Sequence, residues 1–266
     1  MDHETVLAYL DRVGVTAPAA SDAAGLRTLH RAHQLTVPFE NLSIHLAEPI
    51  SLDECDLIDK IVRRRRGGFC YELNGAFALL LEALGAQVSR VAARVHGEAG
   101  LGPPFDHLAL IVRPADGSGP WLADVGFGSH SDYPLLTEAR DDQDDPAGRF
   151  RLADAGAGDI DVLKDGRPQY RIETRERSLA DCVPTCWWQQ TSPPVALHPQ
   201  HDLLPADPGR PGFHQRPDAH PDHPGRDPDR AAARYPRRAA RGVPGPLRHR
   251  AEPAAGRPGR IASQPT

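Results

Sequence analysis

The chain has 266 residues, of which 39% are hydrophobic and 25% charged, and its formal net charge is −5. These values are ordinary for a globular protein, and no apolar run approaches the roughly 20 residues of a membrane span. Residues 1–4 lack the basic and apolar parts of a signal peptide, and four scattered cysteines do not make a disulfide framework. We therefore expect a cytoplasmic protein, whose reducing surroundings keep a reactive thiol usable.

The first 85 residues predict a helical bundle. Val6, Leu10 and Val13 repeat at helical spacing before Gly14, a common stop, and Asp22 can cap a second helix.

Two further helices follow in the sequence. Ser51 and Glu54 match a capping box, in which each side chain binds the other residue's backbone N–H, and this helix would carry Cys55 on its inner side. The fourth helix begins at Cys70 and stops at Gly85. Its predicted buried stripe consists of Leu73, Phe77, Leu80, Leu81 and Leu84.

From residue 86 the pattern changes to strands. Asp165-Gly166 predicts a hairpin with a tight turn, and Pro168 predicts that the strand after the turn lies at a sheet edge. Helices first and antiparallel strands afterwards predict an α+β protein, with a helical domain at 1–85 and a strand domain at 86–192. The expected strands are 87–96, 107–113, 121–125, 160–164 and 167–173.

Residues 193–266 differ from the rest in composition. They hold 16 of the 27 prolines and carry 12 Arg against 7 acidic residues, with no Lys and no hydrophobic period. Such a tail predicts little ordered structure. A basic tail can signal nucleic-acid binding, but we expect a change of reading frame near Pro193 or Pro194. Shifting plausible GC-rich codons for 211–220 by one base gives an alternating, strand-like segment.

The stretch RGGFCYELN at 66–74 carries the strongest chemical signal. Gly67 and Gly68 let the backbone turn sharply and leave room beside Cys70. At the start of a helix, free N–H groups and the dipole favour a thiolate with a lowered pKa, the form that attacks a carbonyl. The alternative is a buried cysteine that only starts a helix; the glycines and polar neighbours favour the reactive role.

A nucleophilic cysteine needs a base, and the base needs a group that orients it. His107 opens one predicted strand and Asp124 ends the next, so an antiparallel pair would bring both to one edge, facing Cys70. Taken alone, each could instead be a solvated strand end or a turn cap. The histidines expected at the surface or in loops are His3, His30, His33 and His45.

Together these residues resemble the arylamine N-acetyltransferase family. Besides 66–74, the likeness rests on VPFENL at 37–42, the strand that begins at His107, and DVGFG at 124–128, in the family's order and spacing. It runs from the N-terminus to about Pro193. Relatives continue with an α/β lid domain that the tail does not resemble, so we expect the lid to be degraded or absent.

The resemblance implies a helical bundle followed by an antiparallel β-barrel, with a papain-like triad of Cys70, His107 and Asp124 at their interface. It implies ping-pong acetyl transfer from acetyl-CoA, as co-substrate, to an arylamine or arylhydrazine through a thioester on Cys70, as in xenobiotic metabolism. It also implies an aryl pocket and coenzyme A contacts. The pocket residues would be Phe39, Tyr71, Val95 and Phe127, and the coenzyme A contacts Gly126, Phe127 and Gly128.

Other interpretations stay open at this point. An amide synthase of the same fold would take a larger acyl group, a papain-like hydrolase would use water, and a lid-less pseudoenzyme would only bind aryl ligands or a partner. No nucleic-acid or membrane partner is expected. The arginine run at 63–66 ends a helix, where positively charged side chains offset the partial negative charge of the helix C-terminus, so the run has a structural explanation. No metal is expected, because Cys182 and Cys186 lack matching ligands at zinc spacing.

Overall fold

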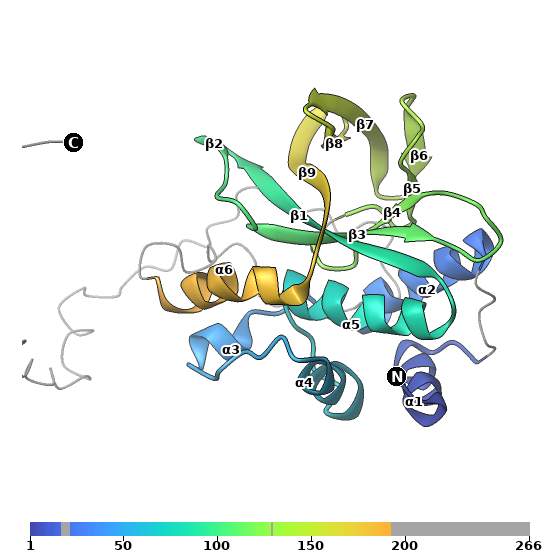
Figure 1. The fold of residues 1–266 in the computed structure, drawn as a ribbon, viewed down its shortest axis with the longest axis vertical. Coiled ribbons are helices and arrows are strands. Elements are labelled where there is room, and N and C mark those ends of the chain that lie inside the picture. Colours follow the sequence, from blue (N-terminus) through green and yellow to red (C-terminus); the bar gives the residue numbers. More distant parts are fainter. Residues whose placement is uncertain (17–21, 129, 193–266) are drawn as a thin grey trace, which may run out of the picture. The chain divides into compact units, whose positions relative to one another are not determined.

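The structure, a computed structural model, describes residues 1–16, 22–128 and 130–192; the predicted tail and the expected loss of the lid, at 193–266, lie outside this part. Helices fill most of the first 85 residues, and one more follows the strands (Figure 1). The described helices are α1 (His3–Val13), α2 (Ala23–Thr36), α3 (Leu42–His45), α4 (Glu54–Ile58), the π-helical turn η1 (Asp59–Arg63), α5 (Cys70–Ala83) and α6 (Leu179–Thr191).

The ends of α1 and α2 follow the predicted signals. Gly14 ends α1 with a φ of 72°, in the left-handed region that glycine tolerates. Asp22 Oδ1 accepts a hydrogen bond from Gly25 N–H at 2.7 Å and so caps α2. The first two helix predictions are confirmed.

The third predicted helix differs from its expectation in two ways. The capping box is wrong, because α4 begins after the N-cap Asp53, and Ser51 Oγ accepts from Asp53 N–H at 3.1 Å. Cys55 is exposed rather than turned inward. The chain passes from α4 into the π-helical η1, whose wider turn changes the angular spacing of side chains. Cys55 lies in the first turn of α4, whereas the buried residues of this helix, Leu57 and Ile58, stand at its end.

The strands form one antiparallel sheet that nearly closes into a barrel, which confirms the predicted fold class. Its order is β5-β4-β3-β1-β9-β8-β7-β6, with β2 paired to β1. Gln143 of β6 joins the two edges: its Oε1 accepts from Leu136 N–H at 2.8 Å, and its Nε2 donates to Leu136 O at 3.1 Å. The strands are β1 (Gln87–Gly97), β2 (Gly100–Leu101), β3 (His107–Arg113), β4 (Trp121–Ala123), β5 (Leu135–Leu136), β6 (Gln143–Asp145), β7 (Gly148–Gly156), β8 (Asp159–Lys164) and β9 (Arg167–Arg177).

Strand β3 separates two hydrophobic cores. Leu108 and Leu110 pack into the core shared with the helices, whereas Ala109 and Ile111 belong to the core inside the barrel. Side chains alternate along a strand, so His107 at the start of β3 lies on the barrel side. Helix α5 packs beneath β1 and β3 (Figure 1) and is buried on nearly every side.

The expected edge position of the strand after the Asp165-Gly166 turn is wrong. Strand β9 lies between β1 and β8 rather than at an edge. Pro168 is tolerated because β1 pairs with β9 only from Tyr170 onward, so the start of β9 is locally unpaired on that side. The domain also ends in a helix, α6, whose Leu179 packs near Gly75 of α5.

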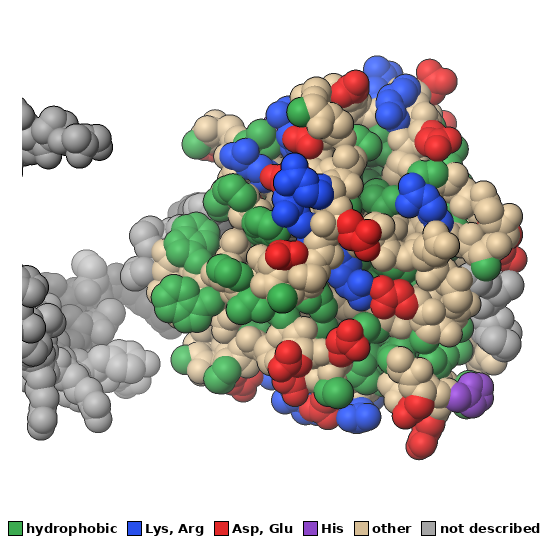
Figure 2. All heavy atoms as spheres, in the orientation of Figure 1, with side chains coloured by type: hydrophobic (Ala, Val, Ile, Leu, Met, Phe, Trp, Pro, Cys, Tyr) green, Lys and Arg blue, Asp and Glu red, His purple; other side chains and the backbone are tan. Residues whose placement is uncertain are grey.

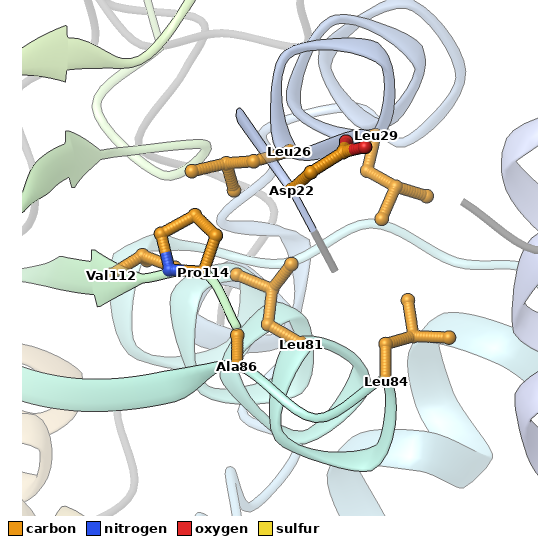
Figure 3. A pocket seen from close by; sticks show the side chains of 8 residues that line it. All are labelled: Asp22, Leu26, Leu29, Leu81, Leu84, Ala86, Val112 and Pro114. Carbon is orange, nitrogen blue, oxygen red and sulfur yellow. The ribbon is translucent and has the colours of Figure 1, made fainter. Parts of the chain in front are cut away.

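A small apolar pocket lies at the far end of α5 from Cys70 (Figure 3). Leu81 and Leu84, near the end of the predicted fourth helix, line it opposite Leu26 and Leu29 of α2. A helix of 14 residues is about 20 Å long. This pocket is therefore separate from the site at the start of α5.

The distribution of surface charge and the lengths of the helices agree with the expectations from composition. Acidic and basic side chains are interspersed on the face shown in Figure 2. Within residues 1–16, 22–128 and 130–192, no helix is both long and apolar enough to cross a membrane.

Candidate active site

Cys70 is buried at the first position of α5. The two preceding glycines are needed for close contacts. A Cβ on Gly67 would collide with the Pro38 carbonyl, and a Cβ on Gly68 would lie 2.8 Å from Glu72 Oε2. The turn into α5 therefore packs in a way that larger residues would prevent, as the sequence indicates.

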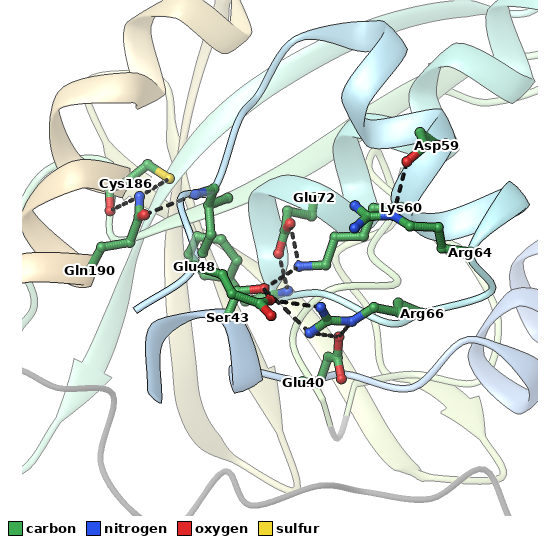
Figure 4. A network of polar contacts seen from close by, with 12 residues as sticks. Glu40, Ser43, Glu48, Asp59, Lys60, Arg64, Arg66, Glu72, Cys186 and Gln190 are labelled. Carbon is green, nitrogen blue, oxygen red and sulfur yellow. Dashed lines mark hydrogen bonds and ion pairs between the residues drawn. The ribbon is translucent and has the colours of Figure 1, made fainter. Parts of the chain in front are cut away.

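Ion pairs hold the backbone on both sides of the glycines (Figure 4). Lys60 Nζ lies 2.6 Å from Glu72 Oε1 in a buried pair, and Glu72 Oε2 accepts from Phe69 N–H at 3.2 Å. Arg66 pairs with Glu40 at 3.1 Å. These contacts fix the entry to α5 just before the cysteine.

His107 and Asp124 form a buried pair. His107 Nε2 lies 2.7 Å from Asp124 Oδ2, and both side chains are buried. Because an ionised carboxylate only accepts hydrogen bonds, Nε2 carries the hydrogen of the neutral ring and Nδ1 is its acceptor nitrogen. A base for a thiol proton requires this tautomer.

The charge of Asp124 is stabilised despite its burial. Burial alone would raise the pKa of Asp124, but the attraction and hydrogen bond of His107, together with His130 and Asn74, outweigh burial and hold that pKa below its usual value. Asp124 is therefore ionised at neutral pH.

Asn74 connects three elements of the site, a role that the sequence analysis missed. Its Nδ2 donates to Asp124 Oδ1 at 2.9 Å and to Leu108 O at 2.6 Å, and its Oδ1 accepts from Val125 N–H at 3.0 Å. Asn74 follows Cys70 by four residues, so both lie on one face of α5. That spacing was the available signal.

His30 and His33 were predicted at the surface or in loops, and this prediction is wrong, because both are fully buried. His30 Nε2 accepts from Asp124 N–H at 3.1 Å, and its Nδ1 lies 3.0 Å from Asp132 O. Burial lowers the pKa of His30, and a neutral ring satisfies both backbone groups at once. His30 thus holds the backbone of Asp124.

The surroundings of the Cys70 sulfur differ from the expected helix-end thiolate. Burial raises the pKa of the Cys70 thiol well above its usual value, and a hydrogen bond from Leu108 N–H only partly opposes this. Burial thus disfavours an isolated thiolate, so forming the thiolate requires a partner in the site that takes the proton. Because Leu108 follows His107 in β3, the sulfur lies against the strand end that carries the candidate base.

Gly126 packs on the backbone of Cys70. Its N–H donates to Asp124 Oδ1 at 2.9 Å, and a Cβ at this position would lie 2.8 Å from Cys70 Cα and 2.7 Å from Asn74 Nδ2. The Asp124 loop can approach α5 this closely only with glycine at position 126.

We expect Gly126→Ala to push the Asp124 loop away from α5. The added methyl should lower the free energy of unfolding by about 1–3 kcal/mol, as overpacking does, and should slow iodoacetamide alkylation of Cys70. Denaturant unfolding and mass spectrometry measure the two effects. Gly97→Ala is the control, because its Cβ would meet only Gly100 O at 3.8 Å; equal effects of the two variants would contradict the packing argument.

Two of the predicted aryl-pocket residues lie near His107. The Phe127 ring is 5.1 Å from the His107 ring and 4.8 Å from the Tyr170 ring. Val95 pairs with Tyr170 in the register of β1 and β9, and the Tyr170 ring is also 5.1 Å from His107. Phe127 and Val95 therefore lie on the barrel side of the site.

The other two lie at the entry to α5. The Tyr71 ring is fully buried and packs edge-on against Phe69, while its hydroxyl donates to the Phe105 carbonyl. Phe39 forms an isolated backbone bridge with Gly68. These two residues support the turn that precedes and contains Cys70.

Known proteins are similar to this chain in sequence and in fold. A family model described as an N-acetyltransferase matches residues 22–203. The arylamine N-acetyltransferase / N-hydroxyarylamine O-acetyltransferase of Salmonella typhimurium is 40% identical over 153 residues, 56% of this chain and 53% of that protein. The arylamine N-acetyltransferase of Escherichia coli is 35% identical over 204 residues, 74% of this chain and 70% of that protein.

Solved structures give the same result. The Salmonella typhimurium enzyme superposes with a TM-score of 0.67 at 33% identity, covering 73% of this chain and 72% of that one. The Mycobacterium marinum enzyme in complex with CoA superposes with a TM-score of 0.65 at 34% identity, covering 71% and 72%.

These matches define the class of protein as an N-acetyltransferase. More narrowly, the chain belongs to the arylamine N-acetyltransferase family, a family of acyltransferase enzymes. The matched part spans about half the length of the Salmonella relative and about 70% of the Escherichia coli relative.

Proposed function

We propose that this protein transfers an acetyl group from acetyl-CoA to an arylamine or arylhydrazine by a ping-pong mechanism, with Cys70, His107 and Asp124 as the catalytic residues. The observation that carries the proposal is the buried 2.7 Å contact between His107 Nε2 and Asp124 Oδ2, held beside the start of α5 by Asn74 and Gly126. The relatives' names supply the arylamine, and the arylhydrazine comes from the family resemblance.

In the first half-reaction the thiol proton of Cys70 moves to His107 Nδ1, and the sulfur attacks the acetyl carbonyl carbon of acetyl-CoA. The new S–C bond forms as the C–S bond to coenzyme A breaks, and His107 returns the proton to the departing sulfur. Because burial disfavours an isolated Cys70 thiolate, proton transfer to a base paired with Asp124 is required. The product is an acetyl thioester on Cys70.

In the second half-reaction the amine nitrogen attacks the thioester carbonyl. His107 Nδ1 takes the nitrogen's proton, the C–S bond to Cys70 breaks to release the amide, and His107 returns the proton to the Cys70 sulfur to restore the thiol. Asp124 keeps the imidazole in the tautomer that accepts at Nδ1 and stabilises the transient imidazolium.

The resemblance implies four residues that contact the aryl ring, and their positions in the structure support this role to different degrees. Phe127 and Val95, beside His107 and Tyr170, suit contacts with an aryl ring, whereas Tyr71 and Phe39 support the turn into α5. For coenzyme A, Gly126 packs against α5, while Gly128 is exposed with a φ of 83° and leaves room for a ligand to approach the backbone. Phe127 lies between them.

A coenzyme A release assay tests the proposal. With acetyl-CoA alone, we expect a burst of free coenzyme A no larger than one equivalent, and steady release only when an arylhydrazine is added. Steady release without amine would indicate a hydrolase, and reaction only with larger acyl thioesters would indicate an amide synthase. If no acyl thioester releases its thiol, the chain is a pseudoenzyme and the proposal is wrong.

The tail bears on how coenzyme A is held. The family match runs to residue 203, past Pro193 and Pro194, so the change of reading frame that we propose lies nearer residue 203 than the composition indicated. We expect such a change to weaken coenzyme A binding without altering the triad. Resequencing the gene tests it, and an intact frame there would overturn it.

A further inference from the structure

His130 is a buried histidine behind the candidate triad that the mechanism above does not use. Its Nε2 lies 2.6 Å from the Tyr170 hydroxyl, and its ring stacks on Phe150 at 5.4 Å. Burial and the charge of Asp124 raise the pKa of the Tyr170 hydroxyl well above its usual value, and the Tyr170 ring lies 5.1 Å from the His107 ring. A chain of contacts thus leads from His130 through Tyr170 to the residue that orients His107.

The hydrogens along this chain can be assigned from its ends. Ser131 N–H donates to His130 Nδ1 at 2.6 Å, so Nδ1 is an acceptor and the hydrogen of the neutral ring is on Nε2. His130 Nε2–H then donates to the Tyr170 oxygen. The single hydrogen of the Tyr170 hydroxyl is left to donate to Asp124. With that hydrogen on Asp124, every donor in the chain is directed toward the carboxylate.

We propose that His130 is a positioning residue that sets the Asp124–His107 pair by committing the Tyr170 hydrogen to Asp124. Aligned hydrogen bonds strengthen one another in a dry interior. Without His130 Nε2–H, the Tyr170 hydroxyl loses the partner that fixes its rotation, and Asp124 loses alignment with His107. The inference rests on the proposed function, because it assigns His130 to the same site.

The charge state of His130 fits this role. Burial lowers the pKa of His130 to about 4, with Asp124 opposing the shift and the cationic forms of His30, His107 and Lys164 adding to it. His130 is thus neutral in ordinary buffers, and the chain of donors is intact there.

Thiol reactivity tests the proposal without acetyl-CoA or a lid. We expect His130→Phe, which keeps a ring against Phe150 but removes both nitrogens, to slow iodoacetamide alkylation of Cys70 at neutral pH by about threefold to tenfold, the size of one net hydrogen bond. His130→Gln, whose amide can still donate to Tyr170, should restore most of the rate. Unchanged rates in His130→Phe would overturn the proposal.

A double-mutant cycle separates positioning from general damage. If His130 acts through Tyr170, then His130→Phe should have little further effect on alkylation in a Tyr170→Phe background, and additive losses would contradict the proposal. His33→Phe is the matched control: His33 is also fully buried, but its hydroxyl partner is Tyr9, at 3.1 Å. It should lower thermal stability without changing the alkylation rate.

The tautomer gives a second test that does not depend on the variants folding. Nitrogen-15 NMR of the wild-type protein should show the His130 hydrogen on Nε2; a hydrogen on Nδ1 would overturn the proposal.

Failure of this inference can be distinguished from failure of the proposed function. A Cys70 that resists alkylation in the wild type would refute the proposed function and this inference together, whereas a reactive Cys70 insensitive to His130 would refute the inference alone.

Discussion

Asp124→Asn should remove most activity while leaving the fold intact. In the native site Oδ1 accepts from Gly126 N–H and Asn74 Nδ2, so an asparagine keeps its oxygen there and turns its NH₂ group toward His107 Nε2. His107 must then accept at Nε2 and carry its hydrogen on Nδ1, the nitrogen that should take the thiol proton. The analogous change in a serine triad costs about 10⁴-fold, and we expect a loss of at least about 10²-fold here.

Acetylation kinetics and far-UV circular dichroism measure this effect. Asp161→Asn is the matched control, because Asp161 also contacts a histidine, His96, at 3.3 Å, but both side chains are partly exposed, unlike the buried Asp124 and His107. It should retain near wild-type activity. An Asp124→Asn enzyme within a few-fold of wild type would mean that Asp124 only supports the following turn.

The positions of the candidate triad could be predicted because each residue stands at an element boundary with a local signal. The glycine pair marks the start of α5 at Cys70, and β3 and β4 begin and end where the hydrophobic runs do, which places His107 and Asp124 at strand ends. The exposure of His3 and His45 was also predicted correctly. What sequence could not supply was the environment of the sulfur.

That environment depends on tertiary packing. A helix N-terminus favours a thiolate, yet β3 and the Asp124 loop exclude water from Cys70, and burial dominates its pKa. The close approach that does this is made possible by Gly126, whose contact with Cys70 spans more than 50 residues of sequence. From the sequence alone, Gly126 could be recognised only as part of a family motif.

The buried histidines of α2 were missed for a different reason. Leu26, Leu29, His30 and His33 stand at i, i+3, i+4 and i+7, the spacing of one buried helix face, and all four are buried. A hydrophobic pattern that counts histidine as polar detects only the two leucines of this face. Partners on distant elements bind three of the four ring nitrogens: the backbones of Asp124 and Asp132 bind His30, and the Tyr9 hydroxyl binds His33 Nε2. His33 Nδ1 is buried without a hydrogen-bond partner among the described residues.

Cys70 should be the only cysteine that becomes acetylated, and Cys70→Ala should lower acetyl transfer by at least about 10⁴-fold, as loss of a nucleophile does in other covalent enzymes. Its sulfur lies against the strand end that carries His107, and no other cysteine in the described residues has a histidine–carboxylate pair beside it. Brief exposure to acetyl-CoA followed by peptide mass spectrometry locates the acetyl group.

Cys55 makes this test stringent. It was expected to face inward and be inert, but it is exposed, so it is the thiol most accessible to chemical acetylation. Cys182 and Cys186 are buried, and burial raises the pKa of each to about 12, which suppresses their thiolates. Solvent exposure alone therefore favours acetylation of Cys55, whereas proximity to a base favours acetylation of Cys70. Cys55→Ala should leave both labelling and turnover unchanged; an acetyl group on Cys55 with none on Cys70 would refute the assignment of the nucleophile.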